Sequence, residues 1–467
     1  MSRRAAVVAG ACALLAVTLL GAHGAPGARA AGGPAPCVAR ATPVRLGLDL
    51  VRRATDGRLV TLTLASRAMG GRQRVAVLLP RGYPAGGRRR YPVLYLLHGT
   101  GGSYAGWSAQ GDVARIVGDR RLIVVMPDDS ANGAYTDWYG LPTGVHAPVP
   151  AWESYHLSEL LPWIDRHYRT VAARGGRIVA GLSSGGAGAM KYAARHPGLF
   201  GWAGSFSGAV DLGLPAYRAV APALNAATPP GGLPGTCTFG PPGADAAGVA
   251  ANDATALAPN LKGTGLFVAS GSGVPGPLDA PGPITDVQAG VERVVWPMNQ
   301  AFATALDAAG VARTTDFYGS GTHAWPYWQR ELGRFLTWLD PRVGHPQPAP
   351  RAFSVRSGEA AFAAWGWDFA VRRGVRELLY LSDVRRAGLT AQGSGTVTVT
   401  SPPLYRPGRR YRVGAATRPR HVAVADADGR LRFGVDLGPA HRHPQTTFTP
   451  EARRTWRRAV IHIDEAR

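Results

Sequence analysis

The segment RIVAGLSSGGAGAMKYAARH, residues 177–196, constrains the fold of this chain more than any other segment. Residues 177–182 form a short apolar run that predicts a strand, and the Gly- and Ala-rich run after them predicts the start of a helix. Ser183 lies at this junction between Gly181 and Gly185, in the only Gly-x-Ser-x-Gly sequence of the chain. A strand that turns sharply into a helix needs small neighbours and exposes the serine at the turn, so we expect Ser183 to be a nucleophile. A plain Gly-rich loop is the alternative in a chain with 62 Gly, and the position between two regular elements argues against it.

The regions around this segment alternate between strand and helix patterns. WESYHLSELLPWIDRHY, residues 152–168, has apolar residues at three- and four-residue spacing, which predicts an amphipathic helix. Strands that alternate with helices predict a mostly parallel sheet with helices on both faces, and active sites of such α/β folds lie at the carboxyl ends of the strands. The runs that predict strands are RLVTLTLAS, RQRVAVLLP, YPVLYLLHG, RLIVVMPDD, RIVAGLS and GLFVASGSG.

The composition and residue pattern of the chain change after residue 340. Residues 341–352, PRVGHPQPAPRA, are rich in Pro and predict a linker. Beyond them polar and apolar residues alternate, and ADADGRL predicts the turn of a β-hairpin. We therefore expect a catalytic α/β domain at 31–340 and a small antiparallel β domain, sandwich-like, at 353–467.

The first 30 residues have the pattern of a signal peptide. Arg3 and Arg4 precede an apolar run, and a small-residue stretch ends in Ala28-Arg29-Ala30, which predicts export and cleavage after Ala30. The alternative is a membrane anchor, but the apolar run is shorter than the roughly 20 residues that a span needs. We expect a protein that is secreted and either free outside the cell or associated with the cell wall. Cys37 and Cys237 remain after cleavage, and their spacing does not decide between a disulfide and two free thiols.

The formal charge of +22 comes almost entirely from Arg, since Lys occurs only at positions 191 and 262. The Arg residues are scattered rather than clustered with stacking aromatics, which argues against a nucleic-acid partner. A basic surface does favour contact with an anionic cell envelope. No other segment predicts a membrane span, and no His or Cys spacing predicts a metal site or a cofactor.

A serine nucleophile needs a base and oxyanion donors. His323 lies on a Gly-rich loop before an amphipathic helix, downstream of Ser183 as the order serine, acid, histidine requires. His98 is upstream of Ser183, so we do not expect it to be the base. The loop in LLHGTGG, residues 96–102, predicts the backbone N–H of Thr100 as one oxyanion donor, and Ser184 N–H is the other.

The acid of the triad is not decided by spacing. Asp279, Asp286 and Glu292 all lie between the predicted strand GLFVASGSG and His323. Each could hold the imidazole and stabilise its protonated form.

From about residue 45 to 340 the chain resembles the antigen 85 mycolyltransferases and the esterase D-like branch of the α/β-hydrolases. The resemblance implies an α/β-hydrolase fold and a Ser183–Glu292–His323 triad, because Glu292 precedes an Asn-Gln-x-Phe run as the family acid does. It also implies Thr100 as an oxyanion donor. The motifs that carry it are YTDWYG, WESYHLSELLPWI, GLSSGG, AND, GSG, ERVVWPMNQAF and GTHAWPYW.

The chain departs from this family in one loop. His98 and Gly101 stand where the family mycolyltransferases have an Asp and an Arg that help to hold a trehalose-type ligand. We therefore expect acyl transfer from an ester or lipid through acyl-Ser183, with water, a sugar or glycerol as the acceptor. Trp325, next to the base, is the expected substrate contact, while Trp138, Tyr139, Tyr327 and Trp328 are more often core residues in such a pattern.

Two further points stay open at this level. The β domain could bind wall glycan or only pack on the catalytic domain. A different class of function is an envelope-binding or adhesion protein that has kept the fold without activity, although such a binder has no need of all three triad residues.

Overall fold

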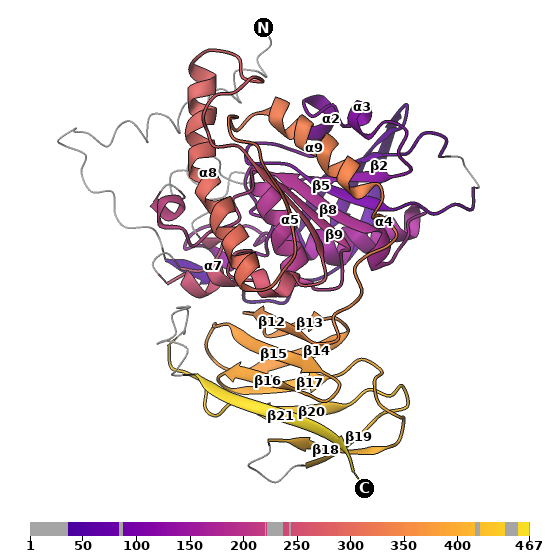
Figure 1. The fold of residues 1–467 in the computed structure, drawn as a ribbon, viewed down its shortest axis with the longest axis vertical. Helices are drawn as coiled ribbons and strands as arrows, with labels where there is room; N and C mark the ends of the chain where they lie inside the picture. The colour runs from indigo at the N-terminus through magenta and orange to yellow at the C-terminus, as the bar shows by residue number, and fades with distance from the viewer. Residues whose placement is uncertain are drawn as a thin grey trace, which may run out of the picture.

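The structure is a computed structural model that describes residues 36–83, 87–219, 221, 237–241, 244–415, 421–443 and 456–466. The predicted signal peptide, residues 1–30, lies outside the described residues. Figure 1 shows two parts stacked end to end: an α/β part, residues 36–340, and a smaller sandwich part, residues 353–466. No helix in the described ranges is both long and apolar enough to cross a membrane.

A nine-stranded sheet forms the centre of the α/β part, with the order β11-β10-β9-β8-β5-β6-β4-β3-β2. Its parallel strands are β5 (Val93–Leu97), β6 (Ile123–Pro127), β8 (Arg177–Leu182), β9 (Trp202–Phe206), β10 (Gly265–Ser270) and β11 (Thr314–Phe317). The antiparallel edge consists of β2 (Leu48–Asp56), β3 (Leu59–Ser66) and β4 (Gly71–Leu78). All six predicted strand segments form strands of this sheet.

Helices cover both faces of the sheet because its parallel strands are apolar on both sides. Tyr95 and Val179 face a core formed with α4 (Leu161–His167), α5 (Ser184–Arg195) and α8 (Pro283–Ala308). Their neighbours Leu94 and Ala180 face a second core formed with α2 (Gly106–Ala109), α3 (Val113–Val117) and α9 (Trp325–Leu339). The expected α/β-hydrolase fold class is confirmed.

The helix predicted at 152–168 forms, but its middle is not α-helical. Residues Ser154–Leu160 are a π-helix (η1), which continues directly into α4. A π turn has hydrogen bonds between residues five apart instead of four, a small change in pitch, so the three- and four-residue spacing indicates a helix without distinguishing the two forms. The shorter elements of this part are β1 (Cys37–Ala39), β7 (Gly140–Pro142), α7 (Ala246–Asn252) and the 3-10 helices η2 (Arg174–Gly176) and η5 (Ala258–Leu261).

The sandwich part consists of two antiparallel sheets around one apolar core. The six-stranded sheet contains β12 (Phe353–Ser357), β15 (Leu379–Arg385), β16 (Gly388–Gly393), β21 (Arg457–Glu465), β18 (Arg410–Gly414) and β19 (His421–Val424). The four-stranded sheet contains β13 (Ala361–Ala364), β14 (Trp367–Arg372), β17 (Thr396–Thr400) and β20 (Arg432–Asp436).

The prediction of a β-hairpin at ADADGRL is wrong in one respect: the turn is present, but the two strands beside it do not pair with each other. The turn forms, with Gly429 N–H donating to Asp426 O and Arg430 N–H to Asp426 Oδ1. The strands that it joins, β19 and β20, belong to different sheets. A turn depends on a few neighbouring residues, whereas the partner of a strand depends on how all strands of the sandwich pack around the core.

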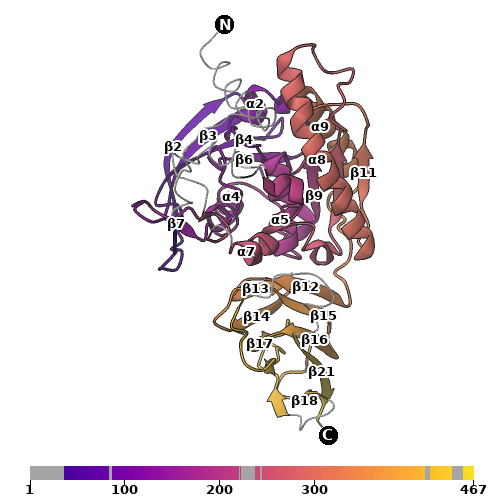
Figure 2. The same cartoon turned by 90° about the vertical axis from the view of Figure 1, so that its left-hand side faces the viewer.

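The sandwich part contacts the amino-terminal ends of the central strands. The Asn260 side chain accepts a hydrogen bond from Arg356 N–H and donates to Arg356 O, at 2.8 Å each. Trp365 lies 4.8 Å from the Arg174 guanidinium, just before β8. Figure 2 shows the same junction from the side. Because active sites of this fold lie at the carboxyl ends of the strands, the sandwich part lies at the opposite edge from that position.

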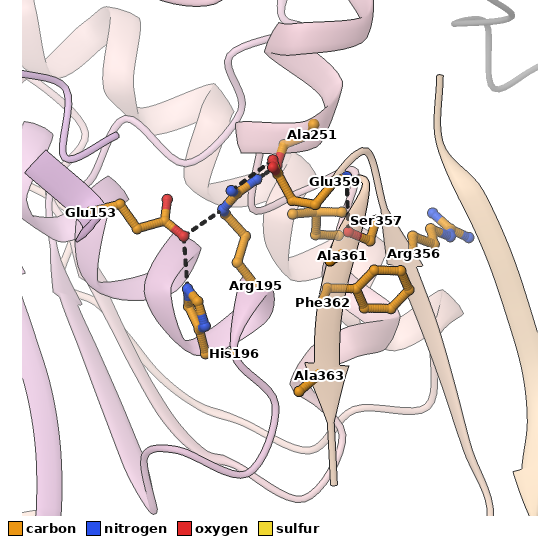
Figure 3. A pocket seen from close by; sticks show the side chains of 11 residues that line it. Glu153, Arg195, His196, Ala251, Arg356, Ser357, Glu359, Ala361, Phe362 and Ala363 are labelled. Atoms are coloured by element: carbon orange, nitrogen blue, oxygen red, sulfur yellow. Dashed lines mark hydrogen bonds and ion pairs between the residues drawn. The ribbon is translucent and has the colours of Figure 1, made fainter. Parts of the chain in front are cut away.

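A cavity of about 80 Å³ lies within this junction (Figure 3). Arg195 spans it, pairing with Glu153 at 2.9 Å and with Glu359 of the sandwich part at 2.8 Å. Burial alone would raise the pKa of Glu153, but Arg195 and His196 lower it strongly. The cavity is therefore lined by charges that already neutralise one another.

Cys37 and Cys237 form a disulfide, with their Cα atoms 5.7 Å apart. The bond joins β1, which pairs with β7, to a segment 200 residues further along the chain. This resolves the choice that the spacing of the two residues left open.

Candidate active site

Ser183 lies at a sharp turn between β8 and α5. Its backbone has φ +53° and ψ −124°, a strained conformation for a residue with a side chain, and its N–H donates to Phe206 O. A Cβ on Gly181 would lie 2.5 Å from the Gly185 carbonyl, and one on Gly185 would lie 2.4 Å from His98 O. Both contacts are with backbone atoms that cannot move aside, so the turn requires glycine at both positions.

The structure brings Ser183, His323 and Glu292 together in one hydrogen-bonded chain. Ser183 Oγ lies 2.8 Å from His323 Nε2, and His323 Nδ1 lies 2.6 Å from Glu292 Oε2. The Glu292 side chain is fully buried, and that of His323 is 9% exposed. An imidazole between a serine hydroxyl and a buried carboxylate can accept the hydroxyl proton while the carboxylate stabilises the resulting charge.

The second oxygen of Glu292 is held by three donors that the sequence interpretation missed. Oε1 accepts hydrogen bonds from Ser207 Oγ at 2.7 Å, Ser270 Oγ at 2.9 Å and Gly271 N–H at 2.8 Å. These donors satisfy a carboxylate that would otherwise be costly to bury. Their only sequence signal is their position, because Ser207 and Ser270 stand at the carboxyl ends of β9 and β10.

The other two candidate acids have different surroundings. Asp279 accepts hydrogen bonds from Tyr327 Oη, Gly276 N–H and Thr322 Oγ1, so it holds the loop that precedes His323. Asp286 is exposed in the first turn of α8. Of the three, Glu292 alone contacts the imidazole.

The loop after β5 lies directly against the serine. A Cβ on Gly99 would be 3.1 Å from Ser183 Cβ. In that loop Gly101 N–H donates to Ala131 O and Gly102 N–H to Gly99 O, whereas the described residues offer Thr100 N–H no backbone acceptor. Ser184 is the first residue of α5, so its N–H has no acceptor within the helix. Ser184 and the loop that carries Thr100 thus both lie beside Ser183.

His98 has a structural environment rather than a catalytic one. Its Nε2 accepts a hydrogen bond from Asp129 N–H at 3.0 Å, so Nδ1 carries the proton and donates to Gly99 O at 2.8 Å. The buried ring therefore ties the loop after β5 to the loop after β6.

Trp325 is half-buried beside the base. Its ring meets those of Trp107 and Trp328 edge to face, at 5.3 and 5.4 Å, and Trp328 in turn packs edge-on against His323 at 5.0 Å. Trp325 therefore supports the loop that carries the base while part of its surface stays open. Trp138, Tyr327 and Trp328 are buried, and half-buried Tyr139 lies 5.9 Å from the Arg376 guanidinium at the sandwich junction.

Comparison with known proteins places this site in a family. Residues 66–339, more than half of the chain, match the family model named Esterase. Esterase Rv1288 of Mycobacterium tuberculosis is 35% identical over 233 residues, which cover 48% of this chain and 49% of that protein. The chain thus spans about half the length of the first curated relatives that it matches.

Antigen 85B of Mycobacterium leprae, a diacylglycerol acyltransferase/mycolyltransferase, is 32% identical over 250 residues, which cover 52% of this chain and 73% of that protein. The solved structure of Mycobacterium tuberculosis MPT51 has 24% identity and a TM-score of 0.47, and the match covers 60% of this chain and 95% of that one. The expected resemblance to the antigen 85 and esterase group is confirmed. The chain belongs to the Esterase family of serine hydrolases and, within it, is similar to the antigen 85 acyltransferases.

Proposed function

We propose that this protein is an exported serine esterase that hydrolyses acyl esters through an acyl-Ser183 intermediate. The hydrogen-bonded chain from Ser183 through His323 to buried Glu292 is the observation that supports this proposal most directly. The N-terminal pattern of residues 1–30 supports export.

In the first step His323 Nε2 takes the proton of Ser183 Oγ while Oγ attacks the ester carbonyl carbon. The carbonyl oxygen becomes an oxyanion that accepts hydrogen bonds from the N–H groups of Thr100 and Ser184. Collapse of this intermediate breaks the ester bond, and the leaving alkoxide takes the proton from His323. In the second step water attacks the acyl group, His323 accepts the water proton, and the carboxylic acid leaves as Ser183 is reprotonated.

Water is the acceptor that the loop after β5 favours. The family residues that hold a sugar ligand are replaced by His98, which is buried and fully engaged, and by Gly101, which has no side chain. Neither can bind a sugar hydroxyl or a charged group of an acceptor. The competing acceptor is a glycerol or sugar hydroxyl, as the name of the antigen 85B relative suggests. Glycan binding by the sandwich part stays a prediction.

The test uses the purified protein from residue 31 onward with a chromogenic medium-chain ester, with and without glycerol or trehalose. Mass spectrometry should show free acid as the main product, at a rate that added alcohol does not change. Ser183→Ala should abolish turnover. An acylated alcohol that forms faster than free acid would show an acyltransferase, and wild-type protein without turnover on any ester would contradict the proposal.

A further inference from the structure

The loop between β10 and α8, together with the first turn of α8, carries three exposed large apolar residues. Val274, Leu278 and Ile284 are 52%, 43% and 61% exposed. Single exposed apolar side chains are common on protein surfaces. Leu46, Leu50 and Val51, in and before β2, form a second exposed group, so what distinguishes the three at 274–284 is their place next to the loop of His323. We call the exposed residues of 274–284 the apolar rim.

The apolar rim lies at the catalytic edge of the sheet. The loop leaves the carboxyl end of β10, the edge where Ser183 follows β8, and α8 then runs back along the sheet. Its backbone contacts the loop that carries His323, since Gly273 N–H donates to Gly321 O and Gly321 N–H to Val274 O. Figures 1 and 2 show one end of α8 projecting past the sheet, away from the sandwich part.

The apolar rim is firmly anchored. Asp279 ties the loop to Tyr327 and Thr322 through its two carboxylate oxygens, and Leu278 N–H donates to Tyr327 Oη at 3.3 Å. Pro275, Pro277, Pro281 and Pro283 restrict its backbone further. Ordering such a loop against a partner costs little conformational entropy, because most of that entropy is already lost on folding.

The charge of the rim indicates what kind of surface it fits. The chain has 52 Lys and Arg, yet residues 264–292 contain none. The carboxylate of Asp279 is occupied within the loop, and the exposed charges next to the rim are Asp286 and Arg293, which lies against Gly273. An anionic membrane is bound through clusters of several Lys and Arg, and a single Arg beside Asp286 is not such a cluster, so this surface is unsuited to one. An apolar rim flanked by one acidic and one basic residue, with no cluster of cations, fits an aggregate of uncharged acyl lipid.

We infer that the apolar rim docks the enzyme on aggregates of neutral acyl esters, so that the ester is delivered to Ser183 at the lipid–water interface. This inference rests on the proposed function for its substrate. It assigns the rim a role in reaching aggregated substrate and none in the chemical step.

The test separates docking from turnover by using the inactive variant Ser183→Ala. This protein is mixed with emulsion droplets of trioctanoylglycerol and, separately, with phosphatidylglycerol vesicles, and the bound fraction is measured by flotation. Adding Val274→Ser, Leu278→Ser and Ile284→Ser should weaken droplet binding by about tenfold or more. The matched control, Val422→Ser with Val424→Ser, removes apolar side chains that are 45% and 57% exposed on β19 and should bind as before.

In the active enzyme the rim variant should keep kcat/KM on a monomeric acetyl ester within about twofold and lose activity on droplets in proportion to binding. Equal droplet binding with and without the three substitutions would overturn the inference, as would stronger binding to phosphatidylglycerol vesicles that survives them. An equal loss on monomeric ester would also overturn it. If wild-type protein hydrolyses no ester but droplet binding still depends on the rim, the proposed function fails and the docking surface stands.

Discussion

At the residue scale the site depends on how one carboxylate is held. Glu292 uses one oxygen for His323 and the other for Ser207, Ser270 and Gly271. Sequence reasoning found Ser183 and His323, because the turn and the Gly-rich loop are local patterns. Spacing alone left the acid open, since three acidic residues share the right interval and their environments depend on strands that are distant in sequence. The resemblance to the antigen 85 family implied Glu292, which the structure places against His323.

Glu292→Gln should lower kcat by about 10⁴-fold with little change in KM, because an amide can neither stabilise the protonated imidazole nor ensure its tautomer. Steady-state kinetics on a monomeric ester measures this. Asp286→Asn removes an exposed carboxylate from the same helix and should leave both constants unchanged. A comparable loss from Asp286→Asn, or full activity in Glu292→Gln, would argue that another group supports His323.

At the element scale the turn between β8 and α5 depends on close backbone packing. Gly185→Ala would place a methyl group 2.4 Å from His98 O, forcing α5 away from β5 and moving Ser183. A displacement of about 1 Å at a reacting group costs about 100-fold in rate, so kcat/KM should fall by that order.

The matched control is Gly290→Ala, which lies inside α8 with open space around the added methyl group. It should leave activity intact and raise the unfolding free energy by up to about 1 kcal/mol, since alanine is the better helix former. Steady-state kinetics gives kcat/KM for both variants, and urea denaturation gives their unfolding free energies. Equal activity in the two variants would show that the contact at Gly185 is easily relieved.

His156, a buried residue of the π-helical segment η1, should make the stability of the protein depend on pH. His156 is buried with Nε2 donating to Asp128 O and Nδ1 accepting from Tyr192 Oη. Burial lowers the pKa of His156 from 6.5 to about 3, so the folded protein keeps it neutral while the unfolded chain becomes protonated. Stability from this residue is therefore complete above pH 6.5 and is lost as the pH falls toward 3, by about 2 kcal/mol at pH 5.

Urea denaturation between pH 7.5 and 5 measures this slope. His156→Asn should reduce the change of the unfolding free energy with pH, whether or not the substitution also lowers that free energy at every pH. His167→Asn changes an exposed histidine in α4 and should keep the wild-type slope. Parallel slopes in wild type and His156→Asn would show that other groups cause the dependence.

At the scale of the whole molecule the two parts are joined by buried polar contacts. Asn260 binds the backbone of Arg356 twice and that of Ala194 once, so one amide links η5, α5 and β12. The junction lies at the amino-terminal edge of the central strands, which keeps the catalytic edge and its apolar rim open.

Asn260→Ala should remove about 3 kcal/mol of hydrogen bonding and separate the unfolding of the two parts into distinct transitions. Tryptophan fluorescence and far-ultraviolet circular dichroism, followed together in urea, detect the separation. Asn299→Ala is the control, because Asn299 is equally buried but bonds only within the α/β part, to Gly208 and Val295. It should lower the midpoint without dividing the transition; division in both variants or in neither would contradict this role for Asn260.

The sequence by itself determined β5, β6, β8 and β10 among the parallel strands, though not β9 or β11, together with the turn at Ser183 and the two-part organisation of secondary structure. Apolar runs, glycine spacing and proline content act over a few neighbouring residues, which is why these features could be predicted. Only the tertiary structure decided that Ser207 and Ser270 hold the second oxygen of Glu292, that Cys37 bonds to Cys237, and that β19 and β20 pair in different sheets. These outcomes join residues as far apart as Cys37 and Cys237, 200 positions along the chain. Such contacts form where the strand order of the sheet brings loop ends together, and no local pattern contains that order.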